Sequence, residues 1–402
     1  MRFASAGSVA TLFCAAALML TGAQAKGVRP LYQFQGGGDG NGSVDRLLLD
    51  NAGNLYGVTT ANDTVLGTVF MLSPGGTETV LYAFQYVAQQ ASLPTGGVVM
   101  DAQGNLYGAA RNGGGYNCPE LDPLNPDCGS IYRLATDGTM TTIYSFQGGA
   151  DGGAPVGGLL LDSAGNLYGT TRIGGTGTFC NAGCGTAFKL APDNSKTVLH
   201  NFAGQSDGAM PTGSLIADAQ GNLYGTTSLG GNDRGTVFKL APDGTETQLH
   251  AFNGTDGNQP SGGLVMDKAG NLYGTTPTGG SSGGSYGEVY KIATDGTLTV
   301  LHAFDNADGD GIYPTGGMAI DKKGNLYGTT AQGGKGCHGF GCGTVFQIAA
   351  DGTYSQLDRF KSKLAHNPFG GVVMDGKGNL YGSALGAYGD PDHLGVLYSV
   401  RK

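Results

Sequence analysis

The chain has 402 residues, a formal net charge of −9 and only 13% charged residues. This acidic balance, without tryptophan and without a run of Lys or Arg, argues against nucleic acids and anionic membrane surfaces as partners. Glycine reaches 77 residues, but the glycines recur at a fixed period, so the composition indicates an ordered repeat fold rather than a disordered chain.

The first 25 residues have the features of a secretory signal peptide. Arg2 supplies the charged start, residues 10–20 form the apolar run, and Ala23-Gln24-Ala25 supplies the small-residue cleavage site. No later stretch is long and apolar enough to span a bilayer. We therefore expect a signal peptide at 1–25 and an exported, monomeric protein, periplasmic or extracellular, formed by residues 26–402.

One pattern, Asp-x-x-Gly-Asn-Leu-Tyr-Gly, organises the rest of the chain. It begins at seven positions: Asp50, Asp101, Asp162, Asp218, Asp267, Asp321 and Asp375. The six intervals average about 54 residues, a period typical of repeat architectures.

The copy at residues 211–252 contains four strand-like runs. They span 213–218, 222–227, 236–241 and 245–252. An Ala-Gln-Gly turn joins the first two runs and a Pro-Asp-Gly turn joins the last two, so each pair predicts a hairpin. Four antiparallel strands per repeat of this length are typical of a β-propeller blade, whereas a β-helix coil would be much shorter.

The two ends of the repeat array predict a closed ring. The seventh copy ends after its third strand, at 395–400, while an unpaired fourth strand precedes the first copy at 28–34. Pairing these two segments would complete the last blade and remove the exposed sheet edges. The predicted fold is therefore all-β, a seven-bladed β-propeller in a single domain over 26–402.

Strand order assigns the connections to two faces. The short turns between strands one and two, and between three and four, lie on one side, which we call the short-turn face. The other two connections of each blade lie on the opposite side, which we call the loop face. Because the loop face carries all the long and irregular connections, we expect binding to occur there.

The repeat resembles a known family. The run Asp-Gly-x-x-Pro-x-Gly-Gly-x-x-x-Asp-x-x-Gly-Asn-Leu-Tyr-Gly-Thr-Thr, followed by Gly-Thr-Val-Phe-Lys-Leu and Leu-His-x-Phe, is similar to the GloVer-type tandem repeat of exported bacterial proteins. More distantly it resembles NHL-type propellers. The resemblance covers nearly all of residues 28–402 and implies an exported propeller, but it implies no catalytic residues.

Most of the repeated polar residues are interpreted as structural. The Asp and Asn of each Asp-x-x-Gly-Asn turn can bind backbone N–H groups, and the Leu and Tyr that follow are expected to be buried between blades. His200, His250 and His302 occupy equivalent positions on the outermost strands, where their spacing round the rim excludes a shared metal site.

The six cysteines that follow the signal peptide are expected to form disulfides, because the count is even and the protein is expected to be exported. The cysteines of each adjacent pair share one loop between strands two and three: Cys118 with Cys128, Cys180 with Cys184, and Cys337 with Cys342. Local pairing within each loop is the simplest arrangement, and it would stiffen the loops.

Five aspartates precede the first strand of their blades in an Asp-Gly turn: Asp39, Asp151, Asp207, Asp256 and Asp310. On the loop face they could form a cation-binding ring, and residues 306–311 resemble the start of a calcium loop. The twelfth position of that loop is Gly317 instead of the required Glu. Calcium is therefore one interpretation, and a plain Asp-Gly turn before the strand is the better supported one.

Blade one breaks the pattern near the axis, where Asp45-Arg46 replaces the Gly-Gly or Gly-Ser of the other copies. Arg111 and Arg172 follow the second strands of blades two and three, also at the loop-face end. Guanidinium groups suit carboxylate and phosphate, so Asp45, Arg46, Arg111 and Arg172 form a hypothetical axial site for an anionic small molecule or acidic glycan. A local ion pair of little energetic value is the alternative.

The sequence therefore favours an exported, non-catalytic propeller that binds an unknown extracellular ligand or surface partner through its loop face. A lactonase-like hydrolase or lyase is the first alternative, and it would need further acids converging on Asp45. A structural or adhesive surface protein is the second.

Overall fold

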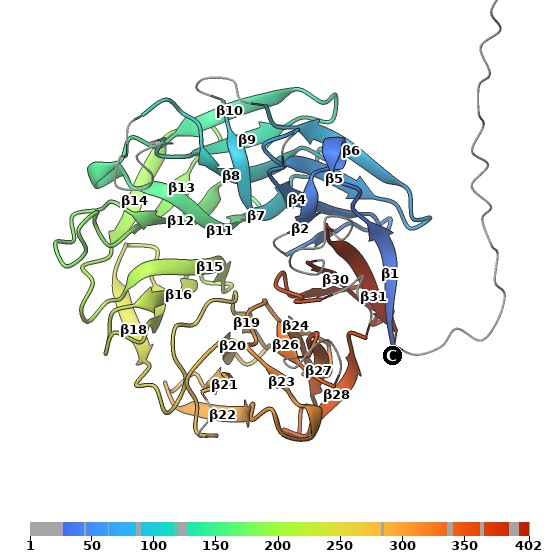
Figure 1. Ribbon diagram of the computed structural model, residues 1–402. Helices are drawn as coiled ribbons and strands as arrows, with labels where there is room; N and C mark the ends of the chain where they lie inside the picture. The colour runs from blue at the N-terminus through green and yellow to red at the C-terminus, as the bar shows by residue number, and fades with distance from the viewer. Residues whose placement is uncertain are drawn as a thin grey trace, which may run out of the picture.

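The computed structural model describes residues 27–401 apart from 44–45, 63, 86–89, 117, 119–126, 283–284, 336–340, 362–365 and 386–393. The predicted signal peptide lies outside the described residues. The chain forms seven antiparallel blades around a central axis, which confirms the predicted β-propeller (Figure 1). In the part of the chain that is described, no helix is long and apolar enough to cross a membrane.

The first four blades follow one another along the chain. Blade 1 contains β2 (Asn41–Ser43), β3 (Leu48–Leu49), β4 (Leu55–Thr60), β5 (Thr68–Leu72) and β6 (Glu78–Ala83). Blade 2 contains β7 (Ser92–Met100), β8 (Leu106–Asn112), β9 (Ser130–Leu134) and β10 (Met140–Ser145). Blade 3 contains β11 (Gly153–Leu161), β12 (Leu167–Ile173), β13 (Thr186–Leu190) and β14 (Lys196–Asn201). Blade 4 contains β15 (Ala209–Ala217), β16 (Leu223–Leu229), β17 (Thr236–Leu240) and β18 (Glu246–Ala251).

The remaining blades complete the ring, and three 3-10 turns lie between blades. Blade 5 contains β19 (Val265–Met266), β20 (Leu272–Thr276), β21 (Glu288–Ile292) and β22 (Leu298–Ala303). Blade 6 contains β23 (Gly311–Ile312), β24 (Ala319–Ile320), β25 (Leu326–Thr330), β26 (Gln332–Gly333), β27 (Thr344–Ile348) and β28 (Tyr354–Arg359). Blade 7 contains β29 (Val372–Met374), β30 (Leu380–Ala384), β31 (Val396–Arg401) and β1 (Gly27–Gln33). The 3-10 turns are η1 (Gly37–Asp39), η2 (Gly149–Asp151) and η3 (Ala307–Gly309).

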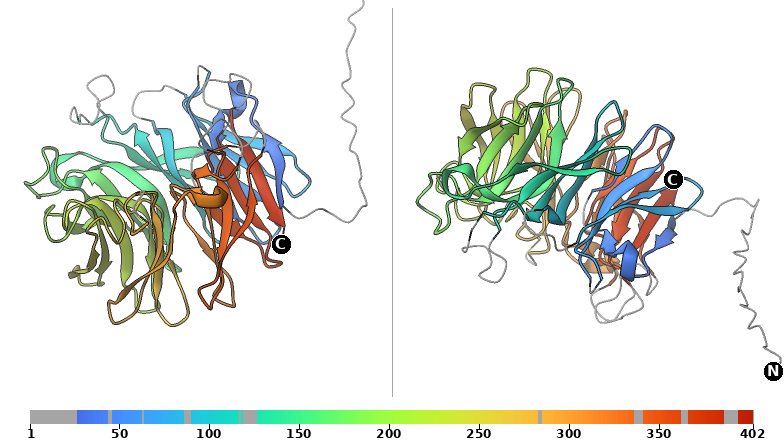
Figure 2. Two further views of the ribbon diagram at one scale, coloured as in Figure 1. Left: turned by 60° about the horizontal axis from the view of Figure 1, so that its bottom comes forward. Right: turned by 90° about the horizontal axis from the view of Figure 1, so that it is seen from above.

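The ring closes through its first strand, as the sequence predicts. β1 pairs antiparallel with β31, with Val28 opposite Val400 and Gln33 opposite Val396. The backbone N–H of Val28 also donates to the Asp358 carboxylate of blade 6, over 2.7 Å. The first and last described strands therefore share one sheet, and the side views show them next to each other (Figure 2).

Seven buried clusters fill the seams between neighbouring blades, one cluster for each seam. At every seam a Phe just after an outermost strand packs edge-on against a ring of the third strand in the next blade, with centroids 5.0–5.5 Å apart. The seven pairs are Phe34–Phe70, Phe84–Tyr132, Phe146–Phe188, Phe202–Phe238, Phe252–Tyr290, Phe304–Phe346 and Phe360–Tyr398. Such edge-to-face pairs add to the burial energy of the seam.

The Asp-x-x-Gly-Asn turn is a hydrogen-bonded unit that repeats in all seven blades. Asp218 accepts bonds from the backbone N–H groups of Gln220 and Asn222, from the Asn222 amide and from the Tyr224 hydroxyl, over 2.7–2.9 Å. Burial alone would raise the pKa of Asp218, but these bonds together lower it. The expectation that Leu and Tyr are both buried is wrong for most tyrosines, which stay half-buried because their hydroxyls must reach the Asp at the surface.

The innermost strands differ between blades. β7, β11 and β15 have nine residues each, whereas β19 and β24 have two. In blades 2, 3 and 4 the innermost strand is therefore continuous up to the loop face.

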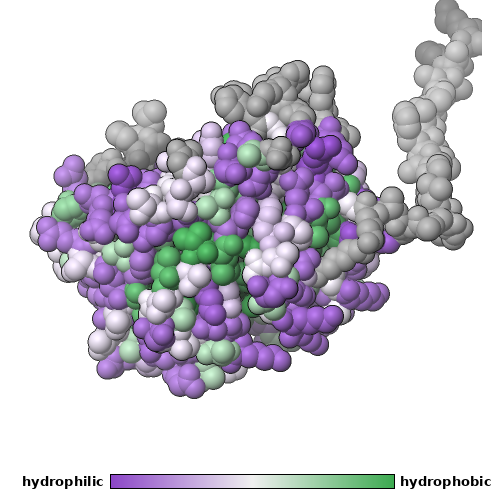
Figure 3. Space-filling view, turned by 90° about the horizontal axis from the view of Figure 1, so that it is seen from below, coloured by the Kyte–Doolittle hydropathy of each residue, from purple (hydrophilic) through white to green (hydrophobic). Residues whose placement is uncertain are grey.

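Figure 3 shows the molecule from below the view of Figure 1. Hydrophilic residues cover most of this side, and apolar residues gather near its middle (Figure 3).

Candidate ligand-binding site

A repeated joint holds neighbouring blades together at the loop face. In six blades the residue before the first-strand proline has a positive φ, which is costly for a residue with a side chain. This conformation lets its N–H reach the preceding blade: Ala154 donates to the Cys128 carbonyl and Met210 to the Cys184 carbonyl, both over 2.8 Å. The proline then packs against the glycine that follows the accepting residue, as Pro211 does against Gly185.

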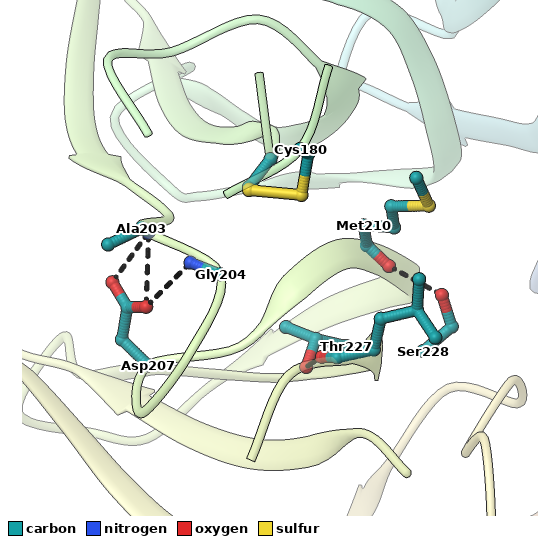
Figure 4. Close-up of a disulfide and its surroundings, with 9 residues drawn as sticks. Cys180, Ala203, Gly204, Asp207, Met210, Thr227 and Ser228 are labelled. Carbon is teal, nitrogen blue, oxygen red and sulfur yellow. Dashed lines mark hydrogen bonds between the residues drawn. A yellow bond between two sulfur atoms is a disulfide. The ribbon is translucent and has the colours of Figure 1, made fainter. Parts of the chain in front are cut away.

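The disulfides anchor the long loops to this joint. Cys118 pairs with Cys128 and Cys180 with Cys184, each with a Cα separation of 5.1 Å, which confirms local pairing. Cys342 is also disulfide-bonded, while its predicted partner Cys337 lies outside the described residues. Figure 4 shows the disulfide of Cys180 and its surroundings. On one side, the backbone N–H groups of Ala203 and Gly204 donate to the Asp207 carboxylate. On the other side, in blade 4, the Ser228 hydroxyl donates to the Met210 carbonyl.

A cavity of about 760 Å³ opens on the loop face where blades 2, 3 and 4 meet. The exposed Phe179 ring belongs to the disulfide loop and lies on its wall. The remaining lining residues are Thr95, Arg111, Ala154, Pro155, Val156, Arg172, Ile173, Cys180, Asn181, Ala182, Gly183, Met210 and Leu229. The cavity therefore combines an apolar wall, an aromatic ring and two cations, which is typical of small-molecule sites.

Arg111 and Arg172 reach the cavity because β8 continues past Ala109-Ala110 and β12 past Thr170-Thr171, the two residues that follow Leu-Tyr-Gly in each strand. Both side chains are exposed, while the residues on either side of them in the strand are buried. The equivalent positions in the other blades carry Ala61, Ser228, Pro277, Ala331 and Leu385. The cavity lining contains no acidic residue among the described residues, so its charge is positive on an acidic protein.

Arg46 lies elsewhere, at the axis. The Gly-Gly positions bring backbones into close contact there, because a Cβ on Gly157 would lie 2.2 Å from the Gly213 carbonyl oxygen. Arg46 lines two axial cavities, of about 510 Å³ toward the short-turn face and about 320 Å³ toward the loop face. The residues of the predicted anion site are therefore separated. Arg111 and Arg172 line the loop-face cavity of blades 2, 3 and 4, and Arg46 lines the two axial cavities. Asp45 lies outside the described residues.

The five aspartates of the predicted cation ring lie toward the rim, each against a Tyr or His of the preceding blade. The pairs are Tyr32–Asp39, Tyr144–Asp151, His200–Asp207, His250–Asp256 and His302–Asp310, at 2.7–3.1 Å. Each of these carboxylates also accepts a backbone N–H group, as expected for the turn. No three His, Cys, Asp or Glu side chains form a metal-binding group within the described ranges, and calcium binding by the five aspartates stays a prediction.

Sequence reasoning missed Phe179 and Met210 as lining residues. The position of the joint could have been predicted, because Cys-Gly recurs at 128–129, 184–185 and 342–343. In each copy the carbonyl of that Cys accepts the N–H of the residue before the proline. The side chains that project from the joint have no such signal, because the residue before proline differs in every blade.

The repeat can be matched to known proteins. The model of the Gloeobacter/Verrucomicrobia repeat matches residues 124–340 and 232–402, more than half of the chain. The chain belongs to the Gloeobacter/Verrucomicrobia repeat family. No individual curated protein matches its sequence significantly.

Solved structures with the same general fold are distant in sequence. The extracellular domain of a B. thetaiotaomicron protein assigned as a one-component system has a TM-score of 0.58 at 10% identity, over 93% of this chain and 40% of that chain. A Xanthomonas campestris gluconolactonase has a TM-score of 0.44 at 17% sequence identity, and the match covers 75% of this chain and 85% of that chain. A luciferin-regenerating enzyme has a TM-score of 0.48 at 16% sequence identity, and the match covers 94% of this chain and 96% of that chain. At these identities the likeness shows the propeller fold alone.

Proposed function

We propose that this repeat-family propeller is an exported, non-catalytic binding protein that takes an anionic small molecule or acidic glycan in the loop-face cavity of blades 2, 3 and 4. The observation that carries the proposal is the convergence of Arg111 and Arg172 on one cavity without an acidic lining residue in the described chain. The local disulfides support export, because such bonds persist in oxidising compartments.

The cavity chemistry suits a carboxylate on a partly apolar body. Guanidinium groups bind carboxylates through paired hydrogen bonds, and the Phe179 ring and the Met210 side chain offer apolar contact to the rest of the ligand. A uronic acid has both features, since its ring presents C–H groups beside the carboxylate. Phosphate would engage the arginines alone and should bind more weakly.

A thermal-shift screen tests the proposal with galacturonate, oligogalacturonates, citrate and inorganic phosphate. A ligand that binds the folded state at about 100 times its Kd stabilises it by about 2.7 kcal/mol, so we expect a shift of a few degrees for an acidic sugar. Phe179→Ala should reduce this shift without affecting the fold, because the ring is half exposed. No shift with any anion would contradict the proposal.

The lactonase-like alternative is tested in the same samples by following lactone hydrolysis. The described residues that line the two axial cavities include no Asp, Glu or His, and Asp45 lies outside the described chain. Turnover that depends on Asp45 would favour that alternative over a binding protein.

A further inference from the structure

Two neighbouring blades depart from the repeat at the loop-face end of the axis. Blade 7 has Phe369 directly after its first-strand proline. Blades 2 to 6 have smaller residues there, namely Thr95, Val156, Thr212, Ser261 and Thr315. Blade 1 has Arg46 two positions further along the same motif, where the other six blades have Gly or Ser. Blades 7 and 1 lie side by side and share the Phe34–Phe70 seam, so the two departures fall on the same part of the ring (Figure 1).

Phe369 and Arg46 line the same axial cavity, the one of about 320 Å³ toward the loop face. Both residues are exposed, and Phe369 is 40% exposed. Glycines form much of the remaining lining, and none of the described lining residues is acidic. This cavity therefore has the same chemistry as the cavity of blades 2, 3 and 4, where the exposed Phe179 accompanies Arg111 and Arg172.

The two cavities meet at β11. Val156 lines the cavity of blades 2, 3 and 4, and the next residue, Gly157, lines the axial cavity. Consecutive Cα atoms lie about 3.8 Å apart, so the two linings are separated by the width of one residue. Gly157 has no side chain that could form a wall between them. Because both cavities open toward the loop face, a ligand there can extend across Gly157 from one cavity into the other.

The repetition of an aromatic ring beside a guanidinium group favours a ligand that repeats too. Guanidinium groups form paired hydrogen bonds with carboxylates, and an aromatic ring offers apolar contact to the C–H face of a sugar. A single uronic acid occupies one such place. A chain of uronic acids presents a carboxylate and a C–H face at every ring, so it fits both cavities at once.

We propose that the loop face binds an acidic oligosaccharide as an extended chain, with one part in the cavity of blades 2, 3 and 4 and another against Arg46 and Phe369. This second subsite rests on the proposed function and gives that function a polymeric ligand. With one arginine in place of two, the axial subsite is the weaker one. Linking the two contacts in one ligand makes the second contact intramolecular, so the affinity rises with chain length until both cavities are occupied.

Calorimetric titrations of galacturonate and its dimer, trimer, tetramer and hexamer into the whole protein test the second subsite. We expect the Kd to fall at least about tenfold from the monomer to the first oligomer that spans both cavities, and to change little for longer chains. One oligomer should bind to each chain.

Arg46→Ala and Phe369→Ala separate the second subsite from the first. Both should lose most of the gain in affinity with chain length, while their affinity for the monomer should fall much less. Tyr116→Ala is the matched control and should keep the full gain, because Tyr116 is a similarly exposed ring on the loop face that lines neither cavity. Melting temperatures close to that of the wild type would show that all three variants are folded.

Two results would show that only one cavity is used and that the second subsite is wrong. One is a Kd that does not depend on chain length. The other is a gain that both Arg46→Ala and Phe369→Ala keep, as expected if a long chain slides over a single site. In either case the proposed function would still stand, because the monomer binds. If neither the monomer nor any oligomer binds, the proposed function fails and the second subsite fails with it.

Discussion

The same seven repeats build the short-turn face and the loop face, but the two faces differ in how many of their side-chain contacts recur from blade to blade. On the short-turn face, the Asp, Asn and Tyr of every blade form the same hydrogen bonds. On the loop face, the backbone joint before the proline recurs in six blades and the Tyr/His–Asp pair in five, but the side chains that line the cavity change from blade to blade. The comparison teaches that the most regular residues of this protein maintain its fold, while the irregular ones shape its cavities.

The largest effect is expected from removing the strand on which both faces depend. Deleting residues 26–34 removes β1, exposes the edge of β31 and takes Phe34 from the seam between blades 7 and 1. We expect loss of a single cooperative unfolding transition in urea, together with association through the open edge. A deletion variant that remains monomeric and unfolds like the wild type would contradict ring closure.

A point mutation on the short-turn face should have the next largest effect. Asp218→Ala removes four hydrogen bonds from one turn, so we expect a loss of about 2 kcal/mol in the free energy of unfolding. Asp243 is the matched control in the same blade and on the same face, since it holds its own turn through Thr245 alone. Chemical denaturation should show a clearly smaller loss for Asp243→Ala than for Asp218→Ala, and equal losses would refute the special role of the repeated Asp.

The seams between blades allow a stabilising test. Tyr132, Tyr290 and Tyr398 are buried at positions where the other four blades have Phe, and their hydroxyls have no hydrogen-bond partner among the described residues. Tyr290→Phe removes an unsatisfied polar group and should stabilise the protein by about 1 kcal/mol in urea unfolding. Phe238→Tyr in the neighbouring blade is the reciprocal variant and should destabilise. A destabilised Tyr290→Phe would mean that the hydroxyl is bonded in solution.

The smallest effect concerns the pH dependence of the rim. Burial raises the pKa of Glu246 to about 7; the His200 charge lowers it and Asp207 raises it. Because the folded-state pKa lies above the usual 4.5, this group favours folding at low pH, and the contribution is lost as the pH rises through about 7. Glu246→Gln should therefore melt on the order of 1–2 °C above the wild type at pH 8 and equally at pH 4. A difference that does not change with pH would contradict this assignment.

The sequence was sufficient to predict the fold, because the seven copies of the repeat can be aligned with one another and show which residues recur in each blade. The turn residues, the alternation of the strands and the unpaired segment at 28–34 predict seven blades and their closure, and β1 and β31 pair accordingly. The half-burial of the tyrosines was missed, because burial was inferred from strand alternation without the hydrogen bond to Asp.

The site could be predicted only in part. Arg111 and Arg172 break the repeat at one equivalent position, so comparing the copies finds them, and the structure brings them to one cavity. Their separation from Arg46 depends on how far β8 and β12 extend, which the repeat does not encode.

The most direct test of the proposed binding function is a calorimetric titration of galacturonate and its oligomers into three proteins. These are the wild type, the double variant Arg111→Ala/Arg172→Ala, and Arg234→Ala, which removes an exposed loop-face arginine that does not line the cavity. We predict one site on the wild type and on Arg234→Ala, and at least about a tenfold weaker Kd for the double variant, equivalent to about 1.4 kcal/mol. Equal affinity in all three proteins would contradict the assignment of the cavity.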